Sequence, residues 1–241
     1  MSGTVYAGDS VEIKITIHPD SVTKARRVLQ LTEDDAHRGH VLYLDTPGDR
    51  FYKNDLVVRV RWNDAIQGDV VVKIRPFDGR RLDARRWKHL EIDYDRIGHR
   101  MLRAATLGKH SDVDLVDEII GGKKPRKVVT GEMKDLIRDW IGPRFEIDWD
   151  SLEVVGPASE LYWPRVKIGD WDKKWEAEFW TLKDRSRVLE VSRKVPRESF
   201  RKLEKRCLSE LQQLGIDASP SEKLKTDRVY DAEKTKQSLA K

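Results

Sequence analysis

The sequence predicts an α+β fold in which about eight or nine antiparallel strands close into a barrel with a charged lumen, packed by peripheral helices. Three observations carry this prediction. Many segments alternate apolar and polar residues with period two, which is typical of half-buried strands. The polar positions of these strands hold pairs of charges, mostly of one sign, and several intervening segments have apolar residues at helical spacing.

The composition describes a highly charged but foldable chain. Of 241 residues, 38% are hydrophobic and 37% are charged, and 47 basic against 42 acidic side chains leave a net charge of only +5. This balance weakens the case for a nucleic-acid-binding protein with one basic face. The single cysteine, Cys207, excludes a disulfide framework and a cysteine-based zinc site. No stretch approaches the roughly 20 apolar residues of a membrane span, so we expect a cytoplasmic protein without a membrane partner.

The first half of the chain is rich in predicted strands. Residues 11–17 alternate strictly and are ended by Pro19, and residues 20–31 have the spacing of an amphipathic helix. Turn-forming residues at 46–49 and 63–64 separate further strands. These are expected at 41–46, 56–62, 69–75 and about 84–94.

The second half combines helices and strands. Ser111 and Thr130 are the predicted N-caps of two helices that end at glycines 121 and 142. Strands are expected at 144–155, 160–168, 173–182 and 187–194, followed by a helix at 196–214 whose apolar face contains Cys207. From Ala218 onward the residues are polar and without period, which predicts one domain over 1–217 and a mobile tail over 218–241.

The paired charges on the strands are the most informative feature of the sequence. Residues i and i+2 of a strand share a face about 6.6 Å apart, and like charges on neighbouring positions repel. A closed barrel whose lumen holds a polyanion and divalent cations would compensate them. The charged positions are Glu12 and Lys14, Arg59 and Arg61, Lys73 and Arg75, Glu91 and Asp93, Arg144, Glu146 and Asp148, Arg165 and Lys167, Glu176 and Glu178, and Glu190 and Lys194.

Several of these segments resemble motifs of the CYTH superfamily, the triphosphate tunnel metalloenzymes. SVEIK at 10–14 resembles the ExExK signature of that family, YLDTP at 43–47 resembles its YFDTP segment, and LVVRVR at 56–61 resembles its LxxRxR segment. VK at 72–73, EAE at 176–178 and VLEVSRK at 188–194 are similar to its later strands. The resemblance covers about residues 8–215, and the number and order of the motifs make it specific.

The resemblance implies a tunnel that hydrolyses a triphosphate or, in some members, cyclises ATP. It implies a catalytic role for Glu12 and Lys14 and a metal site for Mg²⁺ or Mn²⁺. The implied metal ligands are Glu12, Glu176, Glu178 and Glu190. The implied phosphate-binding residues are Lys14, Arg59, Arg61, Lys73, Arg75, Arg165, Lys167 and Lys194. Ser10 departs from the pattern, because it stands where the signature has its first glutamate.

Three functions are compatible with these residues. A metal-dependent triphosphatase is preferred, acting on inorganic tripolyphosphate or on an organic triphosphate, because phosphoryl transfer needs positioning and charge neutralisation rather than a nucleophilic triad. The alternatives are an adenylate cyclase of the same fold, and a non-catalytic protein that binds polyphosphate or nucleic acid. Nucleic acid is the less favoured partner, because the basic run at 80–88 contains only one aromatic residue, Trp87. His37 and His40 are interpreted as solvated histidines without acidic neighbours.

Overall fold

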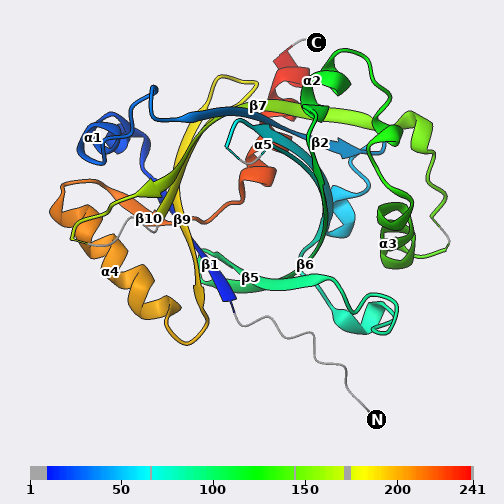
Figure 1. The fold of residues 1–241 in the computed structure, drawn as a ribbon, viewed down its shortest axis with the longest axis horizontal. Coiled ribbons are helices and arrows are strands. Elements are labelled where there is room, and N and C mark those ends of the chain that lie inside the picture. Colours follow the sequence, from blue (N-terminus) through cyan, green and yellow to red (C-terminus); the bar gives the residue numbers. More distant parts are fainter. Residues whose placement is uncertain (1–9, 66, 144, 171–174, 240–241) are drawn as a thin grey trace.

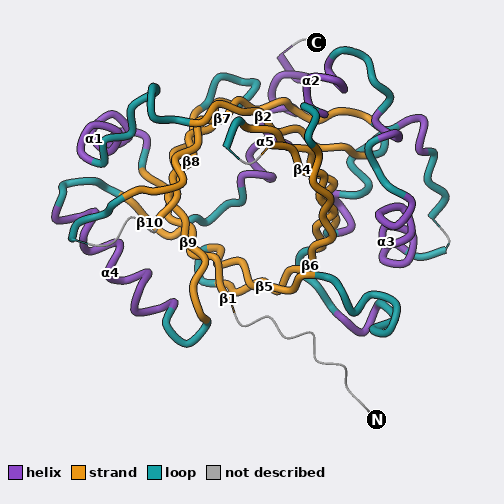
Figure 2. The backbone as a smooth tube through the Cα atoms, in the orientation of Figure 1, coloured by secondary structure: helices purple, strands orange, loops and turns teal. Residues whose placement is uncertain are grey.

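A ring of strands forms the centre of the molecule. The structure is a computed structural model that describes residues 10–65, 67–143, 145–170 and 175–239, with side chains as far as residue 235. Within these residues nine strands close into a barrel, seen end-on in Figures 1 and 2. Their order around the ring is β1 (Ser10–Ile17), β5 (Glu91–Ile97), β6 (Arg100–Ser111), β4 (Gln67–Ile74), β3 (Leu56–Asn63), β2 (His37–Asp45), β7 (Glu153–Val166), β8 (Trp175–Thr181) and β9 (Arg187–Pro196).

Strand β1 closes the ring. It pairs antiparallel with β9 over its whole length, from Ser10 opposite Pro196 to Ile17 opposite Leu189. On its other side it pairs parallel with β5 at Val11 and Glu12. A tenth strand, β10 (Ala218–Pro220), pairs antiparallel with the end of β1. The predicted closed barrel is therefore confirmed, with the correction that the β1–β5 contact makes it mixed rather than fully antiparallel.

Helices cover the outer, apolar faces of the strands. Helices α2 (Leu115–Ile120) and α3 (Gly131–Ile141) pack on β2, β3, β4 and β6, where Trp140, Leu136 and Val58 are buried in one hydrophobic core. On the opposite side, α1 (Val22–Val28) and α4 (Phe200–Gln213) pack on β1, β8 and β9, and Cys207 lies in this core as predicted. No helix in the described part of the chain is both long and apolar enough to cross a membrane.

Some predicted elements differ from the observed ones. Residues 145–148 form a loop and Trp149–Ser151 a 3-10 turn, so the strand predicted at 144–155 is wrong before β7 begins at residue 153. The alternating apolar residues of this loop pack on α3 instead. Helix α2 is capped by Asp114 and not by Ser111, which ends the unpredicted strand β6. Arg144 and Lys173 lie outside the described residues.

The C-terminal segment is part of the fold, which corrects the prediction of a mobile tail. After β10, helix α5 (Lys225–Leu239) begins inside the outline of the barrel in Figure 1. Tyr230 is 1% exposed, its hydroxyl donates to Oδ2 of Asp45 at 2.9 Å, and its ring stacks on Tyr52 at 4.2 Å. Four buried positions dock the helix, at 226, 229, 230 and 232. Such a short set of buried residues does not give the sequence a clear helical period.

Replacing Tyr230 tests this anchor. Tyr230→Phe removes one hydrogen bond to a buried carboxylate, which should lower the free energy of unfolding by about 1.5–3 kcal/mol. Urea denaturation measures the loss, and limited proteolysis should show earlier cleavage within α5. Tyr52→Phe is the matched control, because its hydroxyl donates to the half-buried Asp227 and its loss should be smaller. Equal losses in the two variants would contradict the proposed anchoring role of Tyr230.

Candidate functional site

The lumen of the barrel contains a cavity of about 280 Å³ whose wall is dominated by charged side chains. The period-two alternation of the strands turns these charges inward while their neighbours pack beneath the helices. Eight of the nine charged lining residues are expected site residues, and the ninth comes from α5. They are Glu12, Lys14, Arg59, Arg61, Lys73, Arg75, Glu176, Glu178 and Lys225.

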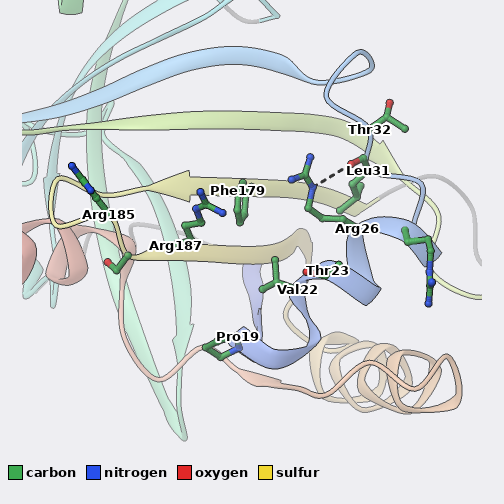
Figure 3. A pocket seen from close by; sticks show the side chains of 11 residues that line it. Pro19, Val22, Thr23, Arg26, Leu31, Thr32, Phe179, Arg185 and Arg187 are labelled. Carbon is green, nitrogen blue, oxygen red and sulfur yellow. Dashed lines mark hydrogen bonds between the residues drawn. The ribbon is translucent and has the colours of Figure 1, made fainter.

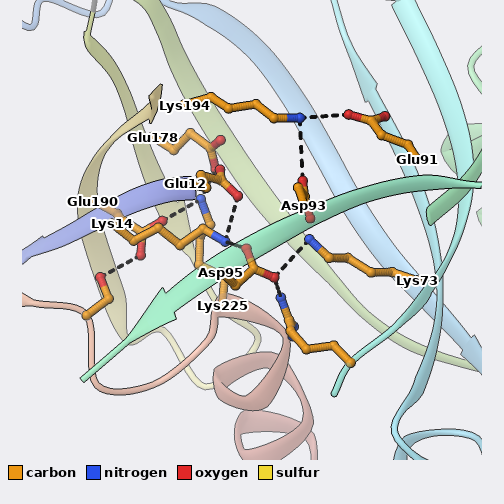
Figure 4. Close-up of polar contacts among 12 residues, drawn as sticks. Glu12, Lys14, Lys73, Glu91, Asp93, Asp95, Glu178, Glu190, Lys194 and Lys225 are labelled. Atoms are coloured by element: carbon orange, nitrogen blue, oxygen red, sulfur yellow. Dashed lines mark hydrogen bonds and ion pairs between the residues drawn. The ribbon is translucent and has the colours of Figure 1, made fainter. Parts of the chain in front are cut away.

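Asp95 holds three of the lumen cations together. Its carboxylate lies 2.7 Å from Nζ of Lys14, 2.9 Å from Nζ of Lys73 and in contact with Arg75 (Figure 4). Burial alone would raise the pKa of Asp95, but these three cations hold it well below its usual range. Asp95 is not among the site residues predicted from the sequence because the predicted strand stopped at residue 94, although Glu91 and Asp93 share its face at period two.

The other phosphate-binding candidates from these strands are also paired with carboxylates. Arg59 and Arg61 share Oδ2 of Asp69, at 3.0 and 3.1 Å. Lys194, which does not line the lumen cavity, lies 2.7 Å from Glu91 and 3.5 Å from a carboxylate oxygen of Asp93. The basic groups that the lumen offers to an anion are therefore held in place by acidic partners before any ligand binds.

Lys225, at the start of α5, compensates a pair of facing carboxylates. Strands β8 and β9 place Glu178 directly opposite Glu190, an arrangement that destabilises a sheet unless a cation lies between the charges. Nζ of Lys225 contacts Glu178 and lies 3.0 Å from Oε1 of Glu190 (Figure 4). Burial alone would raise the pKa of Glu178, but Lys225 lowers it to about 2. Lys225 is thus a site residue that the sequence analysis missed.

Glu12 and Glu176 are the other two glutamates of the cavity, and Glu176 is the one whose negative charge is least compensated by cations. Glu12 lies 2.8 Å from Lys14, whose Nζ is shared with Asp95. Among the described residues, Glu176 has no basic side chain within 4.0 Å. Burial raises the pKa of Glu176, and repulsion by Glu178 and Glu12 adds to this increase. An oxygen-rich group with uncompensated charge is suited to a hard divalent cation.

A second buried carboxyl group lies behind this cluster. Glu160 on β7 is 2% exposed and accepts hydrogen bonds from Nδ2 of Asn63 at 3.1 Å and from Nε1 of Trp180 at 3.0 Å. The same indole nitrogen is 3.0 Å from Glu178, so the two carboxyl groups are neighbours. Burial raises the pKa of Glu160 to about 7, with a further contribution from Glu178.

The structure does not bring every expected residue to the lumen cavity. Arg165 and Lys167 are exposed and line a separate surface pocket beside Leu31 and Trp163. Glu190 is buried, but its oxygens face Lys225 and the hydroxyl of Ser221 at 2.8 Å. Ser10 is half-buried at the first position of β1, opposite Pro196.

A small group of possible metal ligands lies outside the lumen. His40 does have acidic neighbours, contrary to the expectation from the sequence, because its Nε2 lies 3.9 Å from Asp114 and 3.8 Å from Asp117. Ligand atoms of the three residues lie within 4.8 Å of one another. All three are partly or fully exposed, and Asp114 also caps α2, so capping and surface ion pairing account for the group.

Two solved structures share this architecture. A candidate adenylyl cyclase from Hippeastrum, described as having a dominant triphosphatase activity, matches with a TM-score of 0.60 at 14% identity, over 92% of this chain and 95% of its own. A candidate adenylate cyclase from Bacillus halodurans matches with a TM-score of 0.58 at 15% identity, over 92% and 97%. No family model and no curated protein matches the sequence. At these identities the likeness establishes the fold.

The raised pKa of Glu160 predicts a pH dependence of stability. Because its folded pKa of about 7 lies above the ordinary value of 4.5, the folded chain loses stability as the pH rises from 4.5 through 7. Glu160→Gln keeps an acceptor for Trp180 and should flatten this part of the stability curve. Urea denaturation between about pH 5 and pH 8 measures the slope. An unchanged slope in the variant would show that another group causes it.

Proposed function

We propose that the chain hydrolyses a triphosphate bound in the barrel lumen, with the help of a divalent cation. One observation carries the proposal: besides Lys225, five basic side chains line one cavity together with three glutamates. The basic group, Lys14, Arg59, Arg61, Lys73 and Arg75, matches the charge of a polyphosphate. The resemblance to CYTH proteins and the shared fold of the two solved structures support the same reaction class.

The carboxylates provide a place for Mg²⁺ or Mn²⁺. Glu12, Glu176 and Glu178 would hold the cation, since they line the cavity together and Glu176 carries charge that no lysine or arginine of the described residues compensates at close range. When bound, the cation would polarise a phosphoryl oxygen and neutralise developing charge. Glu190 is left out of this set because it does not line the cavity and its oxygens contact Lys225 and Ser221.

The residues of the chain itself bind and orient the phosphates. Burial alone would lower the pKa of Lys14, but Asp95 and Glu12 raise it, so Lys14 stays charged and acts as an electrostatic contact rather than a base. A phosphate that enters replaces a carboxylate oxygen as the partner of these cations. Asp95 and Asp69 therefore keep the cations oriented toward the cavity until the anion arrives.

Product analysis with the purified full chain tests the proposal. Tripolyphosphate, ATP and thiamine triphosphate, each with Mg²⁺ or Mn²⁺, should release free phosphate from at least one substrate. Pyrophosphate together with cyclic AMP from ATP would instead identify a cyclase. A rise in melting temperature with tripolyphosphate but no turnover would identify a non-catalytic binder.

A pair of arginine variants locates the activity. Arg61→Ala should weaken tripolyphosphate binding by about 1.5–3 kcal/mol, the scale of a hydrogen bond to a charged group. Arg165→Ala is the matched control, because this arginine is exposed and does not line the lumen cavity. Calorimetric titration measures both affinities. Equal effects of the two substitutions would place the triphosphate outside the lumen.

Lys225 should compete with the divalent cation for Glu178. Lys225→Met removes a positive charge beside the proposed metal position, so the apo protein should lose stability and bind Mn²⁺ about tenfold more tightly, which corresponds to about 1.4 kcal/mol. Melting curves over a Mn²⁺ series measure both effects. Lys183→Met is the control, because Lys183 pairs with Glu233 of α5 at 2.8 Å and does not line the lumen cavity. Unchanged Mn²⁺ affinity in Lys225→Met would contradict this competition.

A further inference from the structure

A groove on the outside of the barrel is distinct from the lumen. It has a volume of about 750 Å³ and lies between α1, the loop that follows it, and strands β8 and β9 (Figure 3). Phe179 faces this groove, whereas its neighbour Glu178 lines the lumen cavity, because successive side chains of β8 point to opposite faces. The wall of the barrel therefore separates the two sites.

The groove is basic, and none of its lining residues is acidic. Arg26 and Arg27 contribute from α1, and Arg185 and Arg187 contribute from the turn between β8 and β9 and the start of β9. Arg26 has one carboxylate contact, with Glu33 at 3.4 Å. Within the described residues, the other three arginines have no carboxylate within 4.0 Å.

Some arginines outside the groove are paired, as Arg86 is with Asp135 and Asp139 at 2.8 and 2.9 Å, and Arg126 with Asp150 at 2.7 Å. Others, such as Arg165 and Arg201, have no carboxylate within 4.0 Å among the described residues, so the groove is distinguished by gathering three such arginines around one cavity. Of the acids in the adjoining turns, Asp35 accepts a hydrogen bond from Thr32, and Asp184 accepts two from Ser186. The groove thus concentrates positive charge that the chain does not neutralise.

The floor of the groove is apolar. Phe179, Leu31 and Val22 form it, and Phe179 is 7% exposed. In Figure 3, Arg185 and Arg187 lie to one side of Phe179 and Arg26 to the other. A ligand that complements this arrangement has an apolar group between two negatively charged ends.

We propose that this groove binds an acidic peptide segment of a partner protein, in which a bulky apolar residue is flanked by aspartates or glutamates. The apolar residue would pack against Val22, the half-buried residue of the floor, and the flanking carboxylates would pair with the arginines on each side. Single-stranded nucleic acid fits less well. The face of the one aromatic ring is already covered by Arg26, at 5.2 Å from its centroid, so a base has no exposed ring on which to stack.

Fluorescence anisotropy with a labelled Glu-Glu-Leu-Glu-Glu peptide tests the proposal in the full chain at low salt. Arg187→Glu should weaken binding by about tenfold or more, the scale expected for losing a charge-assisted contact. Arg201→Glu, on the exposed face of α4, makes the same change in net charge away from the groove and should have little effect. Replacing the leucine of the peptide by serine should also weaken binding.

Three results would overturn the proposal. One is the absence of saturable peptide binding. Another is an equal loss in Arg187→Glu and Arg201→Glu, which would mean that net charge alone attracts the peptide. The third is tighter binding of a single-stranded oligonucleotide that Arg187→Glu abolishes, which would assign the groove to nucleic acid. Because none of these measurements involves triphosphate turnover, their outcome is independent of the function proposed for the lumen.

Discussion

Charge compensation inside a closed barrel is the constraint on which the rest of the structure depends. A charge that faces a lumen of about 280 Å³ loses much of its hydration, so it needs an opposite charge nearby. Asp95 meets this need for Lys14, Lys73 and Arg75, Asp69 for Arg59 and Arg61, and Lys225 for Glu178 and Glu190. Removing one member of such a group would leave its partners buried without compensation.

The same ion pairs determine which contacts a ligand would have to replace in order to bind in this lumen. The proposed polyanion would not meet free cations, since all six basic residues of the cavity contact carboxylates in the protein alone, five of them an aspartate and Lys225 two glutamates. Binding is therefore an exchange of one set of ion pairs for another, and its free energy is the difference between two large terms. Under the proposed function, a triphosphate would be favoured because a chain of phosphates presents more charge in a fixed spacing than the aspartates do.

How much of this could be predicted from the sequence depends on the range of the interactions. Period-two alternation placed Arg59, Arg61 and Lys73 on lumen-facing strands, because that pattern is local and repeats within each strand. Asp95 was missed through an error of a few residues in one strand boundary. Strand periodicity could not identify Lys225, because Lys225 lies on a helix and reaches the lumen only when that helix docks on the barrel. The helix is weakly amphipathic, so its few buried apolar residues do not predict this docking. The strand predicted from Phe145, Ile147 and Trp149 fails for the related reason that a loop can also bury alternate residues.

The position of β1 in the ring has a consequence for how the chain reaches its native state. β1 holds residues 10–17, yet its antiparallel partners are β9 and β10, which end at residues 196 and 220. Contacts of such sequence separation are slow to form, because a long loop must close before any hydrogen bond compensates its entropy. A ribosome releases β1 well before either of these partners. The ring can therefore close only after residues 187–196 have been synthesised, and until then β1 is an open edge with which a chaperone or another nascent chain can pair.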